Sequence, residues 1–160
     1  MRLQVLAVGR LKPGPERLIA EDYQARAEGL GRKTGISRIT VTEFAESQGP
    51  SPAVRIGEEA RWLAAALPPK AFSIVLDERG KAMASEAFAA LLRRQLDGGT
   101  QDLSFVIGGP DGHAASARDQ AGLLLGFGPM TWPHRLVRIM LFEQIYRAVT
   151  IMVNHPYHRA

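Results

Sequence analysis

Short apolar runs recur along the chain, separated by intervals long enough to hold a helix. Four of them have the length and composition of strands: residues 2–8, 36–44, 72–81 and 103–112. The first, RLQVLAV, is nearly all apolar and ends at Gly9, as does a strand that a parallel sheet buries on both faces. The run at 36–44 instead alternates apolar and polar residues, and the run at 72–81 leads into a turn. The pattern therefore predicts four strands.

Apolar residues at helical spacing fill the intervals between these strands. The expected helices cover residues 12–30, 53–67, 86–99, 114–125 and 134–153. Residues 126–134, GFGPMTWPH, form an apolar stretch that Gly and Pro interrupt. Strands that alternate with helices through short Gly/Pro loops are typical of βαβ units. We therefore predict an α/β fold with a parallel sheet, as a single domain over residues 1–160.

Composition narrows the class of protein. The chain has 160 residues, of which 46% are hydrophobic and 22% are charged, as in an ordinary globular domain. No run reaches the roughly 18 apolar residues of a membrane span, and Arg10 and Lys12 interrupt the N-terminal run too early for a signal peptide. The absence of cysteine excludes disulfides and cysteine-based zinc sites. We expect a cytoplasmic protein that does not engage a membrane.

Positive charge gathers in the C-terminal part of the chain. The formal net charge is +4, and the segment from residue 134 onward contains four arginines but only one acidic residue, Glu143. A basic face suits a polyanionic partner, most often nucleic acid. It also suits a solvated face that keeps a protein soluble. Charge alone leaves both interpretations open.

Three expected strand ends look suited to a ligand. They read VLDERGK (75–81), VIGGPDG (106–112) and GPMTWPH (128–134). In open α/β sheets, ligands bind beyond the carboxyl ends of the strands. Gly108 and Gly109 lack a Cβ, so a ligand's ring or ribose can lie against their backbone. Because neither G-x-G-x-x-G nor a P-loop motif occurs, these ends predict a ligand held by main-chain amides, such as an adenosine.

Three segments, FVIGGPDG, MTWPHRLVRIMLFEQIYRA and the terminal NHPYHR, follow one another in a distinctive order and spacing. Together with LQVLAVGRLK and VLDERGK, they resemble the RlmH (YbeA-like) family over essentially the whole chain. These are the ribosomal RNA large-subunit pseudouridine N3-methyltransferases of the SPOUT class. The resemblance implies a SPOUT methyltransferase fold with a C-terminal deep trefoil knot. It also implies S-adenosylmethionine as methyl donor, no metal, and methylation of 23S ribosomal RNA on assembled ribosomes.

The resemblance further implies a homodimer in which the last helix packs against the partner. Apolar residues cover more than one stripe of 134–153, which is typical of a helix buried in a core or an interface. The protein would then hold its RNA with its own surface. The candidates for phosphate contact are the C-terminal arginines and Arg10, Lys12, Arg32 and Lys33.

The same resemblance assigns individual site residues. The implied donor-binding residues are Leu76, Gly108, Gly109, Gly128, Pro129, Met130, Thr131, Trp132 and Pro133. The implied catalytic residues are Arg147, Tyr157, His158 and Arg159. Methyl transfer from a sulfonium to a ring nitrogen needs in-line positioning, loss of the N3 proton and stabilisation of the negative charge that develops. His158 is a candidate for the base, because histidine titrates close to neutral pH.

Several residues and two other functions stay open. His155 and His158 have a spacing that metal sites use, but no cysteine and no later acidic residue can complete such a site. His134 is expected to be a loop or cap residue and Asp111 a turn residue, while His113 receives no role. A non-catalytic ribosome-binding or assembly factor is an alternative function, as is a SPOUT methyltransferase that acts on tRNA.

Overall fold

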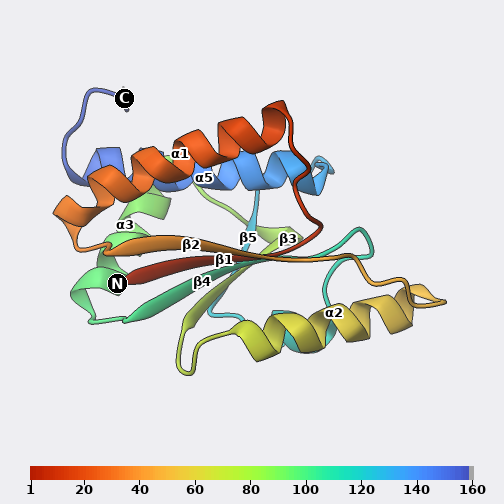
Figure 1. The fold of residues 1–160 in the computed structure, drawn as a ribbon. Helices are drawn as coiled ribbons and strands as arrows, with labels where there is room; N and C mark the ends of the chain where they lie inside the picture. The colour runs from red at the N-terminus through yellow and green to blue at the C-terminus, as the bar shows by residue number, and fades with distance from the viewer. Residues whose placement is uncertain (159–160) are drawn as a thin grey trace.

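A parallel sheet forms the centre of the fold. In a computed structural model, which describes residues 1–158, this sheet has five strands in the order β2-β1-β4-β3-β5. The strands are β1 Arg2–Val8, β2 Arg38–Phe44, β3 Phe72–Ala82, β4 Asp102–Ile107 and β5 Leu123–Gly126 (Figure 1). The predicted α/β class and parallel sheet are confirmed, as are the four predicted strands, except that the one predicted over residues 103–112 ends at Ile107.

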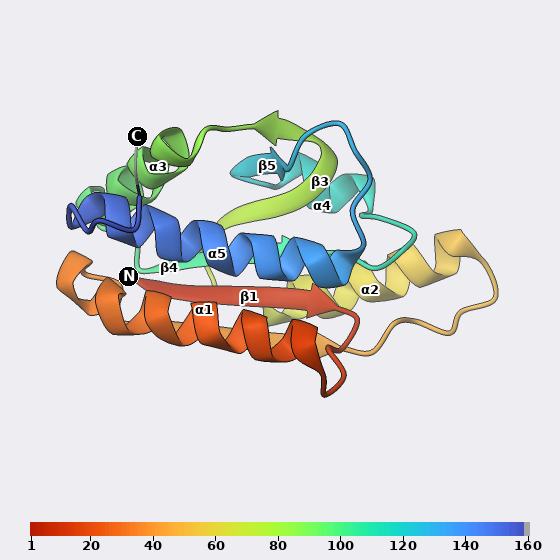
Figure 2. The same cartoon turned by 90° about the horizontal axis from the view of Figure 1, so that it is seen from above.

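Helices cover both faces of the sheet. They are α1 Pro15–Gly31, α2 Pro52–Ala66, α3 Ser85–Asp97, α4 Ala115–Asp119 and α5 His134–Met152, with a 3₁₀ turn, η1, at Arg32–Thr34. Helices α1 and α5 lie side by side on one face, and α2 lies on the other (Figures 1 and 2). Helix α3 packs against α5. Within residues 1–158, no helix is both long enough and apolar enough to cross a membrane.

Alternate side chains of β1 enter two separate cores. Leu3 and Val5 are buried in the larger core, together with apolar residues of α1, α3 and α5. Leu6 and Val8 are buried in the smaller core, where Leu63 of α2 packs. A strand buried on both faces has no polar alternation, and this is why residues 2–8 form one apolar run.

The prediction of a helix over residues 114–125 is wrong. Only residues 115–119 are helical, and residues 123–126 form β5. This strand pairs with β3 in parallel, with Leu125 opposite Leu76. Four apolar residues are too few to show a period of either kind. The neighbouring strand therefore decides their conformation.

A close approach of two backbones joins β3 to β5. The register between them shifts between Leu76 and Lys81, after which pairing resumes. A Cβ built on Gly80 would lie 2.6 Å from the amide nitrogen of Gly126 and 2.7 Å from that of Leu125. Only a residue without a side chain fits here.

Helix α5 runs from the carboxyl edge of the sheet to the opposite edge. It begins at His134 and ends at Met152, and its 19 residues correspond to about 27 Å. Near its start, the buried Arg138 forms an ion pair with Glu43 of β2 and donates a hydrogen bond of 2.6 Å to the carbonyl of Gly9. These contacts hold the start of α5 at the edge where β1 and β2 end.

Candidate active site

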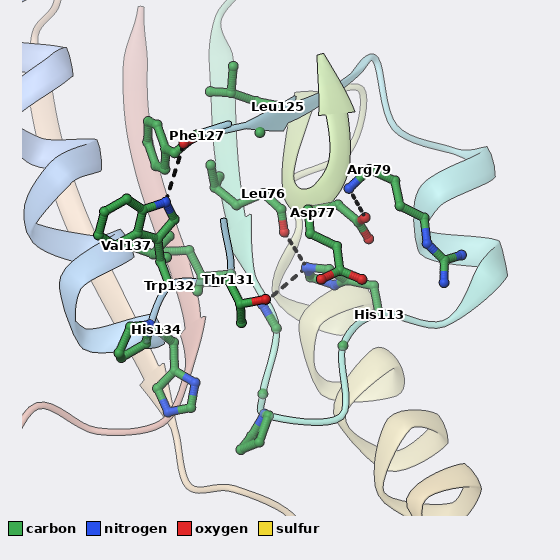
Figure 3. A pocket seen from close by; sticks show the side chains of 18 of the residues that line it. Leu76, Asp77, Arg79, His113, Leu125, Phe127, Thr131, Trp132, His134 and Val137 are labelled. Atoms are coloured by element: carbon green, nitrogen blue, oxygen red, sulfur yellow. Dashed lines mark hydrogen bonds between the residues drawn. The ribbon is translucent and has the colours of Figure 1, made fainter. Parts of the chain in front are cut away.

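A cavity of about 630 Å³ opens at the carboxyl edge of the sheet. The middle of β3 (76–79) lines it, with the ends of β4 and β5, the segments that follow those two strands, and the first turn of α5 (Figure 3). Eight of the nine predicted donor-binding residues line it: Leu76, Gly108, Gly109, Gly128, Met130, Thr131, Trp132 and Pro133. Pro129 is the ninth and is not part of the lining. The fold thus brings the three strand ends singled out from the sequence to one hollow.

The two glycines after β4 accommodate the protein's own side chains. A Cβ on Gly108 would lie 2.9 Å from the ring of His113, and a Cβ on Gly109 would lie 2.6 Å from Oε2 of Glu59. His113 and Glu59 therefore fill the space that a Cβ would take on these residues. The main-chain groups of both glycines remain part of the cavity wall.

His113 is a buried member of the wall that sequence reasoning left without a role. Its Nε2 lies 3.0 Å from the carbonyl oxygen of Leu76 and 3.1 Å from the amide nitrogen of Gly108 (Figure 3). Burial lowers the pKa of His113 below its ordinary value of 6.5, so the ring is neutral at pH 7. The sequence signal that could have found it is a histidine one residue after a glycine turn.

A tight turn returns the chain so that His113 faces the end of its own strand. The amide of Gly112 donates a hydrogen bond of 3.0 Å to the carbonyl of Gly109, closing a four-residue turn with Pro110 and Asp111 at its centre. Gly112 has a φ of +84°, which favours glycine. The expectation of a turn residue at Asp111 is confirmed.

Two ion pairs connect segments of the cavity wall to helices α2 and α4. Asp77, whose side chain is 4% exposed, pairs with Arg118 at 2.6 Å, which joins the middle of β3 to α4. Burial alone would raise the pKa of Asp77, but hydrogen bonds from Arg118 and from the amide of Arg79 hold it below its usual value. Asp111 pairs with Arg55 of α2 at 2.7 Å, and the hydrogen bond from Arg55 lowers the pKa of Asp111. Both carboxylates are therefore charged at neutral pH.

The loop after β5 closes one side of the cavity. Its Trp132 is 39% exposed and donates a hydrogen bond of 3.3 Å from Nε1 to the carbonyl of Phe127, while Met130 is 68% exposed. His134 is the first residue of α5 and lines the cavity. Its Nε2 lies 3.5 Å from Oε1 of Glu46. Core packing therefore does not account for Met130 and Trp132, since both reach solvent.

The predicted catalytic residues lie away from this cavity. Arg147 is in the last part of α5, and Tyr157 and His158 follow that helix. None of these three lines the cavity, whose contact with α5 is at the helix's opposite end. Arg159 lies outside the described residues. Within one chain, therefore, the two predicted halves of the site are separated by most of the length of α5.

Glu143 organises the described part of the tail. It accepts hydrogen bonds from Arg147 at 2.5 Å and from the hydroxyl of Tyr157 at 3.0 Å. The guanidinium of Arg147 also lies 5.0 Å from the centre of the Tyr157 ring. Burial, with hydrogen bonds to Tyr23 and Glu143, raises the pKa of Tyr157, so its hydroxyl is neutral. Nε2 of His158 lies 3.0 Å from a carboxylate oxygen of Glu86.

A second hollow, of about 590 Å³, lies beside the first. Its lining includes Ile19 and Tyr23 of α1, Met140 of α5, and Phe127, which also lines the first cavity. Ile19 is 46% exposed and its neighbour Leu18 is 68% exposed. A hollow flanked by exposed apolar side chains is typical of an interaction surface.

The candidate phosphate-binding residues do not form one patch. Arg10 and Lys12 follow β1 at the carboxyl edge of the sheet, whereas Arg32 and Lys33 lie in η1, beyond the other end of α1. Arg138 is 3% exposed and bonded to the protein itself, so it cannot contact a phosphate. Counting it among the RNA-facing arginines is wrong.

Comparisons with known proteins match this chain to one family and to relatives over their full length. The family model described as "Predicted SPOUT methyltransferase" matches residues 1–158. A relative from Rhodopseudomonas palustris (strain HaA2), named ribosomal RNA large subunit methyltransferase H, is 51% identical over 100% of both chains. A protein of the same name from Bradyrhizobium sp. (strain BTAi1) is 49% identical over 100% of both. Among solved structures, a probable methylase family protein from Haemophilus influenzae aligns weakly, with 10% identity, a TM-score of 0.48, and coverage of 99% of this chain and 70% of that one.

Proposed function

The chain belongs to the SPOUT methyltransferase family, and we propose that residues 1–160 form one domain that methylates N3 of a pseudouridine in 23S ribosomal RNA. S-adenosylmethionine is the methyl donor and the assembled ribosome in the cytoplasm is the substrate. The names of the relatives support ribosomal RNA methylation. The finer choice of base and atom rests on the resemblance of the NHPYHR and GGPDG segments.

The cavity at the carboxyl edge is the proposed donor site, and it is the observation that carries the proposal. Its volume of about 630 Å³ falls within the range of small-molecule sites. Its wall combines apolar side chains such as Leu76 and Val137 with the main chain of two glycine-rich loops. This donor set suits an adenosine with a flexible tail. When bound, S-adenosylmethionine supplies a methyl group on a sulfonium that is already activated for transfer.

The tail residues supply the groups that accept the proton and stabilise charge during methyl transfer. We assign His158 to accept the N3 proton and Arg147 and Arg159 to stabilise charge on the carbonyls beside N3. Tyr157 orients the base through its neutral hydroxyl. Because Glu143 contacts both Arg147 and Tyr157, it keeps these two side chains in one arrangement.

A homodimer would bring the two halves of the site together. Tail and cavity lie at opposite ends of α5 in one chain, so in the dimer the tail of one chain would serve the cavity of the other. The apolar hollow lined by α1, α3, α5 and the loop after β5 supports an interface there. Ile19→Glu should convert the protein to monomers and abolish methylation. Val54→Glu is the matched control, because Val54 is 40% exposed on α2, on the opposite face of the sheet.

Light scattering during size-exclusion chromatography measures the mass directly. A wild-type mass of a single chain, or an Ile19→Glu variant that remains a dimer, would refute the proposed interface.

The knot is proposed on the same family basis. The close backbone contact of Gly80 with β5 supports a tightly enclosed crossing at this point. Pulling the chain by its two ends tests it. A knotted chain would extend to less than the contour length of 160 residues, because the knot retains several residues, whereas full extension would refute the knot.

The substrate is tested with ribosomes from a strain that lacks this protein. Incubation with methyl-labelled S-adenosylmethionine, followed by mass spectrometry of RNA fragments, should place one methyl group on a pseudouridine of 23S RNA. Label in tRNA would favour the alternative substrate. Binding to ribosomes without transfer would favour the assembly factor.

A further inference from the structure

One ring nitrogen of His113 faces two backbone groups that it cannot satisfy together. Nε2 is 3.0 Å from the Leu76 carbonyl and 3.1 Å from the Gly108 amide. The neutral ring either carries a hydrogen on Nε2 and donates to the carbonyl, or lacks it and accepts from the amide. Each tautomer leaves the other backbone group without this partner.

These two groups lie where β3 and β4 separate. The last paired residues of the two strands are Leu76 and Ile107, so the ring lies just beyond the end of their ladder. His113 and its two partners, Leu76 and Gly108, all line the cavity. A carbonyl acceptor beside an amide donor is also the arrangement that recognises an adenine edge, which offers an amino donor beside a ring-nitrogen acceptor.

The surroundings fix the ring in this position and keep it neutral. His113 is 6% exposed, and its ring lies against the Cα of Gly108. The charges that face it are Asp77 from β3, which favours the protonated ring, and Arg118 from α4, which opposes it. Glu59 of α2 packs on the adjoining Gly109. The ion pair between Asp77 and Arg118 leaves little net charge to favour protonation.

We propose that His113 is a positioning residue that satisfies Leu76 or Gly108 in the donor-free chain and releases one of them to the adenine edge when the donor binds. This rests on the proposed donor site. Binding then selects one tautomer, and the ring holds whichever backbone group the ligand does not take.

Two substitutions at His113 separate this role from packing. In His113→Gln, the amide group can donate to Leu76 and accept from Gly108 at once, so it competes with the ligand for both. Affinity for S-adenosylmethionine should fall by about fivefold, the factor that one hydrogen bond contributes. In His113→Leu, both backbone groups are free, so affinity should stay within about threefold of wild type while the donor-free protein melts at a lower temperature.

Calorimetry with S-adenosylmethionine at pH 7.5 and ¹⁵N NMR of the histidine rings provide the measurements. The His113 signals, assigned by their loss in His113→Gln, should move to those of a single neutral tautomer as the donor saturates the protein. Unchanged ring signals at saturation would overturn the proposal, as would wild-type affinity in His113→Gln. If wild-type protein binds no donor at all, the proposed function fails and this inference fails with it.

Discussion

Replacing Gly80 with alanine tests whether the backbone contact between β3 and β5 is as close as the structure indicates. The new Cβ would lie closest to the carbonyl carbon of Leu125 and 2.6 Å from the amide nitrogen of Gly126, whereas ordinary contact begins at 3.4 Å, so β5 must move by at least about 0.8 Å. Main-chain atoms cannot rotate away as a side chain can. We therefore expect the upper end of the overpacking range, a loss of about 3 kcal/mol in the free energy of unfolding.

A loss of this size is readily measured. For a chain of this length it corresponds to a melting temperature lower by about 6–12 °C, which calorimetry or circular dichroism detects. Affinity for S-adenosylmethionine should fall as well, because Leu125 and Gly126 line the cavity. The matched control is Gly57→Ala in α2, where nothing lies within 4 Å of the new Cβ. That variant should gain about 0.5–1 kcal/mol. A Gly80→Ala protein within about 0.5 kcal/mol of wild type would refute the steric reasoning.

Three further outcomes follow from the site and its supports. Removing residues 157–160 should abolish methylation while donor affinity stays within about twofold in calorimetry; full activity would exclude a catalytic tail. Arg138→Met should lower the free energy of unfolding in urea by about 3 kcal/mol, because it leaves Glu43 without its buried partner. Arg135→Met, which breaks a pair whose arginine is 61% exposed, should cost less than about 1 kcal/mol, and equal losses would contradict the argument. His113 has a folded-state pKa below 6.5, so the unfolded chain takes up this proton first. Stability should therefore fall as pH drops from about 6.5 toward the lower pKa, and His113→Leu should remove that part of the slope in melts across pH.

The sequence by itself determined the class of fold and the composition of the site. Both faces of β1 are buried over residues 5–8, so this stretch had to be apolar throughout, and that pattern can be recognised without a structure. The carboxyl ends of parallel strands meet at one edge of a sheet, so three strand ends interrupted by Gly or Pro predicted one cavity. Short-range pattern and general topology were sufficient for both conclusions.

Only the tertiary structure decided the features that depend on residues distant in sequence. Residues 123–126 form a strand because β3 lies beside them, and their own pattern contains no such information. Gly108 and Gly109 are glycines because His113 and Glu59 occupy the space beside them. The tail lies apart from the cavity because α5 extends about 27 Å between them. Periodicity shows which face of an element is buried but not which partner buries it, and the partners determine which side chains line the cavity.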